Sequence, residues 1–187
     1  MAMRVCPWWM GPLLLNPLRR WRLKPERLLA PYLHEGMTVL EPGPGMGFFT
    51  LPMARMVGPA GRVIAVDLQA RMLDGLRRRL LREDLADRVE TRLTARDSMR
   101  IGDLAGTVDF ILAVAMVHEL PSAERFFREA ALVLRPGAPL LLIEPAGHVS
   151  SAAFARELEA ARAAGLHEGE APVVRGSHTA LLRKPAA

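Results

Sequence analysis

Short apolar runs alternate along most of the chain with longer segments in which apolar residues recur at helical spacing. The runs predict buried β-strands, and the fourth is almost uninterrupted, as parallel strands covered on both faces are. The predicted strands are 37–41, 62–67, 89–93, 108–114 and 138–144. The segments between and after them predict helices at 47–56, 70–82, 121–134 and 150–164.

This alternation of strands and helices defines the expected fold. It predicts an α/β, Rossmann-like sheet that is mostly parallel and wound on both sides by helices. Two further β segments, 172–174 and 179–182, are separated by Gly176 and Ser177, which suits a hairpin. The hairpin would add one antiparallel strand near the C-terminal end.

The segment before the first predicted strand differs from the rest of the chain. Four prolines interrupt residues 1–36, so we expect short helices at best. The segment is both apolar and rich in arginine, which suits a flap packed on the domain formed by residues 37–187. An alternative is contact of residues 8–24 with a membrane surface, as in interfacial segments. The side chains concerned are Trp8, Trp9, Trp21, Arg19, Arg20 and Arg22.

Composition narrows the class of protein. The chain has 187 residues, half of them apolar and about a quarter charged, as in a single water-soluble domain with its own core. The one cysteine, Cys6, excludes an internal disulfide and a multi-cysteine zinc module. No apolar run is long enough to span a membrane, and we expect a cytoplasmic protein.

The charge pattern does not favour a nucleic-acid partner, although a basic surface for nucleic acid or an anionic membrane is the alternative interpretation. Lysine and arginine number 25 against 20 acidic residues, for a formal charge of +5. The basic residues cluster at 19–24 and 77–82, which we interpret as solvated helix faces. Aromatic residues make up only 5% of the chain, so it lacks the stacking platform that binders of single-stranded nucleic acid use.

A glycine-rich loop follows the first predicted strand. Gly43, Gly45 and Gly47 are spaced by two and precede a predicted helix, so the backbone can turn tightly and approach a ligand closely. A loop that binds a dinucleotide has the pattern G-x-G-x-x-G. Here Phe48 occupies the place of the third glycine, which disfavours NAD.

Acidic residues beside this loop sharpen the prediction. Glu41 precedes the first glycine by two residues. A carboxylate there would repel a pyrophosphate but would suit the ammonium and sulfonium groups of S-adenosylmethionine. Asp67 ends the second predicted strand, where it can accept both hydroxyls of a ribose. Asp97 and Ser98 follow the third strand within reach of an adenine amine, although Asp97 could instead be a helix N-cap.

Taken together, these motifs resemble those of the class I S-adenosylmethionine-dependent methyltransferases in order and spacing. The motifs are Glu41-x-Gly43-x-Gly45-x-Gly47, Val63–Asp67, Asp97-Ser98, Val108–Val114 and Leu134–Leu142. The chain is most similar to the subgroup that includes quinone-biosynthesis and arsenite methyltransferases, whose His-Glu pair corresponds to His118-Glu119. Because arsenite enzymes bind their substrate through several cysteines, that activity is not expected.

The resemblance implies a seven-stranded sheet with one antiparallel strand and a cofactor at the carboxyl ends of the strands. It assigns the methionine part to Glu41 and the glycine loop, the ribose to Asp67, and the adenine to Asp97 and Ser98. The cofactor-binding residues implied are Glu41, Pro42, Gly43, Gly45, Gly47, Asp67, Leu68, Met72, Asp97, Ser98, Ala113 and Val114.

Four polar residues follow the fourth and fifth predicted strands: His118, Glu119, Glu144 and His148. They could be local caps and loop residues. Alternatively, His118, Glu119 and His148 are catalytic, with a histidine taking a proton from the methyl acceptor. In a third interpretation all four bind a divalent metal, for which the residue types fit but no compact motif exists.

The function predicted from the sequence is methyl transfer from S-adenosylmethionine to a small molecule by direct displacement. Two alternatives remain at this point: an NAD-dependent oxidoreductase, and a non-catalytic binding or scaffold protein that keeps the fold and the cofactor.

Overall fold

The computed structural model describes residues 7–10 and 23–186. Its seven strands form one sheet in the order β3-β2-β1-β4-β5-β7-β6, which confirms the predicted fold class. The chain divides after Thr94 into two compact units, each described here by itself. Half of the predicted flap lies outside the described residues, including Cys6, Trp21 and the arginines at 19, 20 and 22. The flap therefore stays a prediction.

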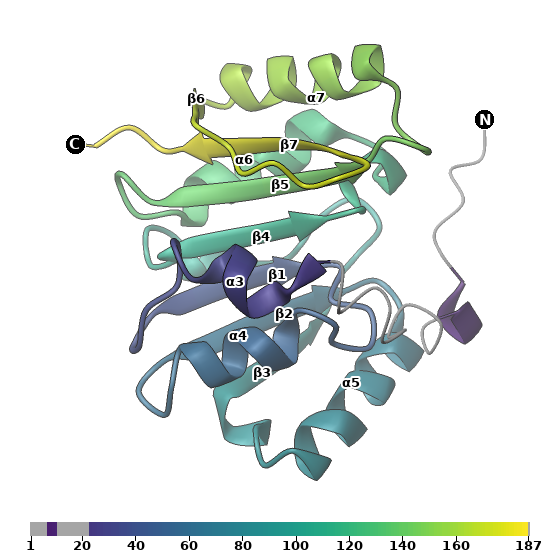
Figure 1. Cartoon of the computed structure of the whole chain (residues 1–187), viewed down its shortest axis with the longest axis vertical. Helices are drawn as coiled ribbons and strands as arrows, with labels where there is room; N and C mark the ends of the chain where they lie inside the picture. Colours follow the sequence, from purple (N-terminus) through teal and green to yellow (C-terminus); the bar gives the residue numbers. More distant parts are fainter. Residues whose placement is uncertain (1–6, 11–22, 187) are drawn as a thin grey trace. The chain divides into compact units, whose positions relative to one another are not determined.

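The first unit contains three parallel strands that lie side by side (Figure 1). Its elements are η1 (Trp8–Met10), α3 (Pro25–Leu29), β1 (Thr38–Pro42), α4 (Thr50–Met56), β2 (Arg62–Asp67), α5 (Ala70–Arg82), η2 (Ala86–Arg88) and β3 (Val89–Leu93). Helix α5 buries Leu73, Leu76 and Leu80, in line with the helical spacing of its apolar residues. The bounds predicted for β2, α5 and β3 are those observed.

The second unit contains the rest of the sheet and two long helices. Its elements are η3 (Gly102–Leu104), β4 (Phe110–Val114), η4 (Val117–Glu119), α6 (Ala123–Val133), β5 (Pro139–Pro145), α7 (Ser151–Ala163), β6 (His167–Gly169) and β7 (Ser177–Arg183). Strands β4 and β5 are parallel, whereas β7 is antiparallel to both β5 and β6. The antiparallel strand near the C-terminal end is thus confirmed.

One predicted strand is wrong. Residues 172–174 form no strand, and β6 lies a few residues earlier, pairing His167 with Arg183 and Gly169 with Leu181. Pro172 has no N–H to give to a strand ladder, and its carbonyl instead accepts the Thr179 hydroxyl at 2.7 Å. Val173 and Val174 favour a strand by their residue type, but they form none here.

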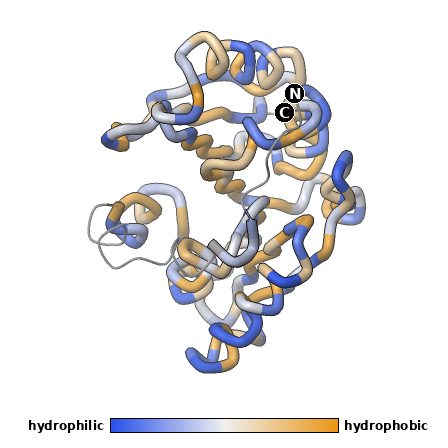
Figure 2. The backbone as a smooth tube through the Cα atoms, turned by 90° about the vertical axis from the view of Figure 1, so that its right-hand side faces the viewer, coloured by the Kyte–Doolittle hydropathy of each residue, from blue (hydrophilic) through white to orange (hydrophobic). Residues whose placement is uncertain are grey.

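Buried apolar side chains and capped helix ends stabilise the second unit. Phe110, Phe127 and Leu141 are fully buried. Ser122 and Ser150 are the N-caps of α6 and α7, where each hydroxyl accepts a backbone N–H of the first turn. Hydrophilic and hydrophobic residues alternate along the helices (Figure 2), as expected for helices with one buried face. No helix within the described ranges has the length and apolar character needed to cross a membrane.

Candidate functional site

The glycine loop between β1 and α4 adopts left-handed backbone conformations. Gly43, Gly45 and Gly47 have φ angles of 68°, 55° and 89°, which residues other than glycine rarely adopt. For this reason α4 begins at Thr50 rather than at the predicted position 47. The Gly43 N–H donates to the carbonyl of Val66 at 2.9 Å and so ties the loop to β2.

The glycines of the loop differ in what surrounds them. A Cβ added at Gly45 would meet no atom within 4 Å, so this side of the loop is open. A Cβ at Gly47 would lie 2.5 Å from the side chain of Leu76 and 2.7 Å from that of Leu51. Gly47 thus allows the loop to pack against α4 and α5, while Gly45 leaves room for a ligand to approach the backbone.

Glu41 is a buried carboxyl group on β1, next to its last residue, Pro42. Its side chain is 4% exposed, and its Oε2 accepts the Thr50 hydroxyl at 2.5 Å. Burial raises the pKa of Glu41 to about 8; the hydrogen bond from Thr50 lowers the pKa, and the negative charge of Asp67 raises it. A cationic group placed beside Glu41 would favour its ionised form, so this carboxyl is suited to an ammonium ligand.

Asp67 ends β2 and is 8% exposed. Its Oδ1 accepts the backbone N–H of Gln69 at 2.8 Å, which fixes the carboxylate at the start of α5. Leu68 is half-buried and Met72 is 2% exposed within the apolar face of α5. The open glycine loop and the two buried carboxyl groups fit the ammonium and ribose of S-adenosylmethionine.

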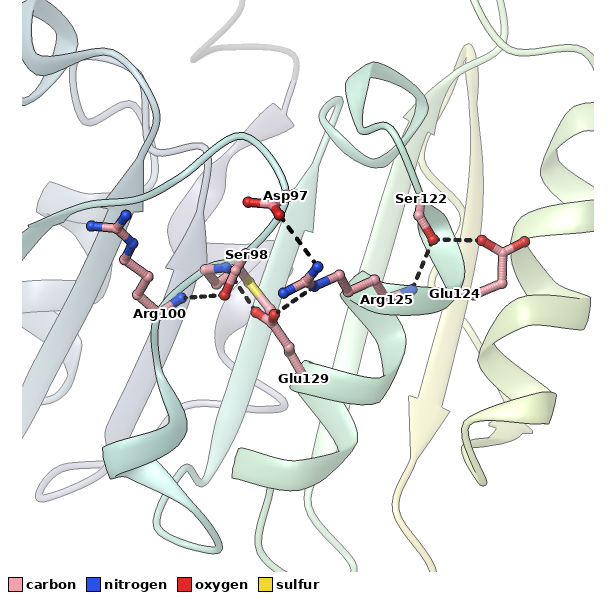
Figure 3. Close-up of polar contacts among 8 residues, drawn as sticks. Asp97, Ser98, Arg100, Ser122, Glu124, Arg125 and Glu129 are labelled. Atoms are coloured by element: carbon pink, nitrogen blue, oxygen red, sulfur yellow. Dashed lines mark hydrogen bonds and ion pairs between the residues drawn. The ribbon is translucent and has the colours of Figure 1, made fainter.

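Asp97 and Ser98 lie in a turn after β3, so the N-cap alternative for Asp97 is wrong. Figure 3 shows that Asp97 instead pairs with Arg125 of α6, with 3.4 Å between Oδ2 and Nη1. Arg125 also pairs with Glu129, whose other oxygen accepts the Met99 N–H at 2.7 Å. The Ser98 hydroxyl accepts the N–H of Arg100. Asp97 and Arg125 are both well exposed, and such pairs contribute little to stability, so the pair can open to release Asp97.

A histidine that follows β4 meets a buried carboxylate that lies at the end of β5. The side chain of Glu144 is fully buried, and its Oε2 lies 2.6 Å from Nδ1 of His118. Its Oε1 accepts the backbone N–H groups of Val117 at 2.8 Å and His118 at 3.4 Å, so Glu144 also holds the turn η4 in place. We refer to these two side chains as the His118–Glu144 pair.

The environment of His118 favours its charged form. The hydrogen bond to Glu144 raises the pKa of His118; burial opposes this, and the charges of Glu144, Glu119 and Glu157 add to it. Just before η4, Ala115 has a φ of 53°, a left-handed conformation that is uncommon for alanine. Its N–H donates to the carbonyl of Ile143 at 2.8 Å, so the chain turns sharply where β4 ends.

The other predicted residues of this region lie near the pair. His148 is exposed, and its ring centre is 6.2 Å from that of His118. Glu119 is half-buried in η4, and Ala113 and Val114 end β4. Across the part of the chain that the structure describes, no three His, Cys, Asp or Glu side chains come together in a way that could hold a metal ion. The metal interpretation therefore has no support.

One residue of this region was missed by sequence reasoning. Glu157 lies on α7 and is 7% exposed, on the same helix face as the buried residues Phe154, Ala160 and Ala161. Burial is the main reason that the pKa of Glu157 is raised to about 7; the charge of Glu144 also raises this pKa, while His118 and Arg156 act to lower it. An acid at an apolar position of the helical pattern was the signal that could have identified it.

Comparison with known proteins identifies the family. Residues 39–137 match the model of a methyltransferase domain, and the chain belongs to this family. The fold is similar to the crystal structure of an S-adenosylmethionine-dependent methyltransferase from Aquifex aeolicus. The TM-score is 0.85 at 27% sequence identity, over 96% of this chain and 99% of that one. The predicted class, a class I S-adenosylmethionine-dependent methyltransferase, is thereby confirmed, and the NAD-dependent alternative finds no support.

Curated relatives are similar over shorter stretches. An arsenite methyltransferase of Halobacterium salinarum is 35% identical over 102 residues, 54% of this chain and 25% of that protein. A ubiquinone/menaquinone biosynthesis C-methyltransferase of Hahella chejuensis is 30% identical over 109 residues, 58% of this chain and 43% of that protein. The chain thus matches less than half the length of these two relatives.

Proposed function

We propose that this chain transfers a methyl group from S-adenosylmethionine to a small molecule that carries an ionisable hydroxyl or carbon acid. The family and the fold support the choice of methyl donor. The observation that carries the choice of acceptor is the 2.6 Å hydrogen bond between His118 and the fully buried Glu144.

The cofactor part of the proposal rests on the first unit. Glu41 would bind the ammonium of the methionine part, because its carboxyl is buried beside a loop that is open at Gly45. Asp67 would accept the ribose hydroxyls at the end of β2. When bound, S-adenosylmethionine supplies a methyl group that is already activated by its sulfonium. The contacts implied for Pro42, Leu68, Met72, Asp97, Ser98, Ala113 and Val114 remain predictions.

The acceptor part of the proposal rests on the His118–Glu144 pair. An ionised carboxylate only accepts hydrogen bonds, so Nδ1 of His118 keeps its proton and donates the hydrogen bond to Glu144. Nε2 of the neutral ring is then a proton acceptor. A base held in one tautomer by a buried carboxylate is the arrangement that general-base catalysis requires. His118 would remove the proton of the acceptor, and Glu144 would orient His118.

Methyl transfer also requires alignment of the reacting atoms and exclusion of water more than covalent help from the protein. The sharp turn at Ala115 and the capping of η4 by Glu144 fix the position of His118 relative to the end of β4. Glu119 and His148 remain further catalytic candidates. The alternative that this chain binds the cofactor without catalysis predicts no methylated product from any acceptor.

The test is transfer of a labelled methyl group to a panel of phenols, enols and carbon acids, with aliphatic amines and thiols as the comparison set. We expect products from the first set, with a rate that rises with pH as His118 loses its proton. Transfer to amines or thiols alone, equally fast in His118→Ala, would contradict the base assignment. Failure to transfer to any acceptor, with cofactor bound, would favour the non-catalytic alternative.

A further inference from the structure

The side chain of Glu157 has a buried oxygen with no hydrogen-bond partner. Among the side-chain oxygens and nitrogens of the described residues, Oε2 of Glu157 is the only buried atom in this state. Buried polar groups in native proteins are almost always partnered, and an exception calls for a cause. The role of Glu157 in the fold supplies none, since the neighbouring positions on this face of α7 are a phenylalanine and two alanines.

The charges around Glu157 come from three elements. Glu144 on β5, His118 on η4 and Arg156 on α7 itself act on Glu157, and Glu119 acts on His118. Across the strand pair β5–β7, His178 stands opposite Glu144, but its Nε2 is bound to the Val149 carbonyl and its ring stacks on Phe154. His148 lies beside His118. No charge from α6 or β6 is among those that shift Glu157.

Glu157 and His118 are coupled in a specific sense. A negative charge on Glu157 strengthens the proton affinity of His118, and a positive charge on His118 weakens that of Glu157. When one of the two groups gains a proton, the other therefore releases its own more readily. Groups coupled in this way titrate together rather than singly.

We propose that Glu157 is a positioning residue of the acceptor site, which releases its proton when His118 receives the proton of the methyl acceptor. The proposal rests on the general-base function of His118 proposed above. The unpartnered oxygen fits this role, because no hydrogen bond to Oε2 favours one protonation state of the carboxyl over the other.

The step balances in protons and charge. The acceptor proton would move to Nε2 of His118, and the electron pair that held it would form the new bond to the methyl carbon. The sulfur–methyl bond would break at the same time, and its electron pair would stay on the sulfur. Glu157 loses its proton to solvent, and the pair of its O–H bond stays on the carboxylate oxygen. Before the step, neutral His118, ionised Glu144 and protonated Glu157 carry a total charge of −1. Afterwards the imidazolium and two carboxylates carry the same charge, so the buried cluster gains none.

Titration of the protein without cofactor or acceptor tests the coupling directly. The ring signals of His118 and the carboxyl carbon of Glu157 are followed by NMR as the pH is raised. In the wild type we expect the His118 signals to titrate in two steps, one of them shared with Glu157. In Glu157→Gln we expect a single step at lower pH, shifted by about one unit. Glu159→Gln, an exposed change on the same helix, is the control and should leave the curve unchanged.

A reciprocal variant keeps the test independent of how well Glu157→Gln folds. In His118→Gln we expect the pKa of Glu157 to rise, because the positive charge that lowered it is gone. Identical His118 curves in the wild type and in folded Glu157→Gln, or an unmoved Glu157 carboxyl in His118→Gln, would overturn the proposal.

The pH dependence of turnover separates this proposal from the proposed function. With a competent acceptor, we expect Glu157→Gln to lower kcat by about tenfold, to move the acid limb of the kcat profile to lower pH and to leave KM unchanged. A purely structural effect would lower stability without moving the limb. If no acceptor is methylated, the proposed function is wrong, and the NMR titration still decides separately whether His118 and Glu157 are coupled. If acceptors are methylated but the limb does not move, the role of Glu157 fails alone.

Discussion

Glu41 in the first unit and Glu157 in the second are both buried acids whose pKa is raised by burial, yet they differ in their partners. Glu41 is held by the Thr50 hydroxyl, whereas one oxygen of Glu157 has no partner. Glu41 stands beside a loop that is open to a ligand, and Glu157 stands on a helix face near other titrating groups. The comparison suggests two uses of a buried acid: to bind a cation, and to respond to a proton.

The two regions also differ in how they are encoded. The residues around Glu41 belong to one continuous stretch, a strand, a glycine loop and the start of a helix. The residues around Glu157 come from three elements, η4, β5 and α7. His118 and Glu144 are 26 residues apart in the sequence, and Glu144 and Glu157 are 13 residues apart. The first region can be read from a motif, and the second exists only once the chain has folded.

The largest expected effect tests the second region. In His118→Ala we expect turnover to fall by about a hundredfold or more, the usual contribution of a general base, because the proposed base is removed. Affinity for the cofactor should stay the same, since His118 has no part in the proposed cofactor site. Steady-state kinetics and calorimetric titration measure the two quantities. Unchanged turnover would remove His118 from the chemistry.

A pH-linked effect tests the first region. Because the pKa of free Glu41 is raised to about 8 and an ammonium group favours the carboxylate, binding of S-adenosylhomocysteine must release a proton at neutral pH. Affinity should therefore rise with pH, by about tenfold per unit below the pKa, and level off near it. Glu41→Gln should bind more weakly, with no such pH dependence. A flat profile in the wild type would show that Glu41 is not titrated by the ligand.

A substitution at the ribose position should have a smaller effect. In Asp67→Ala we expect affinity for the cofactor to fall by more than about tenfold, the scale of losing a charged hydrogen bond. Asp87→Ala, an exposed change in η2, is the matched control. Wild-type affinity in a folded Asp67→Ala variant would exclude Asp67 from the site.

The smallest expected effect is a gain in stability, whereas the preceding substitutions are expected to lower turnover or affinity. In Glu157→Leu we expect the free energy of unfolding to increase by about 1–3 kcal/mol at neutral pH, because an unsatisfied buried carboxyl is removed. The native state of the wild type holds the Glu157 proton up to about pH 7, whereas an unfolded carboxyl loses it near its ordinary value of 4.5. The wild type therefore loses stability between these values, and the advantage of the variant should grow over the same range.

Thermal unfolding from pH 4 to pH 8 measures this difference. The wild type and Glu157→Leu should lie closest at the acid end and diverge toward neutral pH. A variant that is less stable at every pH would mean that Glu157 makes a stabilising contact. The view of Glu157 as an unpartnered acid that responds to the charge of His118 would then be wrong.

The spacing of apolar residues predicted most of the fold, because in most elements proline and glycine positions agreed with that spacing. Strand β2 and helix α5 were located correctly because their apolar positions match the faces they bury. At 172–174 the two valines favour a strand, but Pro172 has no N–H to donate to a strand ladder, so the strand predicted there is wrong. Helix α4 begins three residues later than predicted because left-handed glycines cannot belong to it.

Long-range pairing explains what could not be predicted in the candidate site. Glu41 and Asp67 lie at the ends of β1 and β2, and the glycines follow β1, so all of them have a recognisable place in the sequence. The pairing of Asp97 with Arg125 joins residues 28 apart, and no local pattern announces it. Glu144 was recognised as a polar residue after a strand, but its burial under η4 follows from tertiary packing.

The most direct test of the central claim is calorimetric titration of the purified chain with S-adenosylhomocysteine at pH 7, in two buffers of different ionisation enthalpy. NAD is titrated in parallel. We expect binding of S-adenosylhomocysteine with release of a proton to the buffer, loss of that release in Glu41→Gln, and no binding of NAD. Binding of NAD alone, or no binding of S-adenosylhomocysteine, would contradict the assignment of this chain as an S-adenosylmethionine-dependent enzyme.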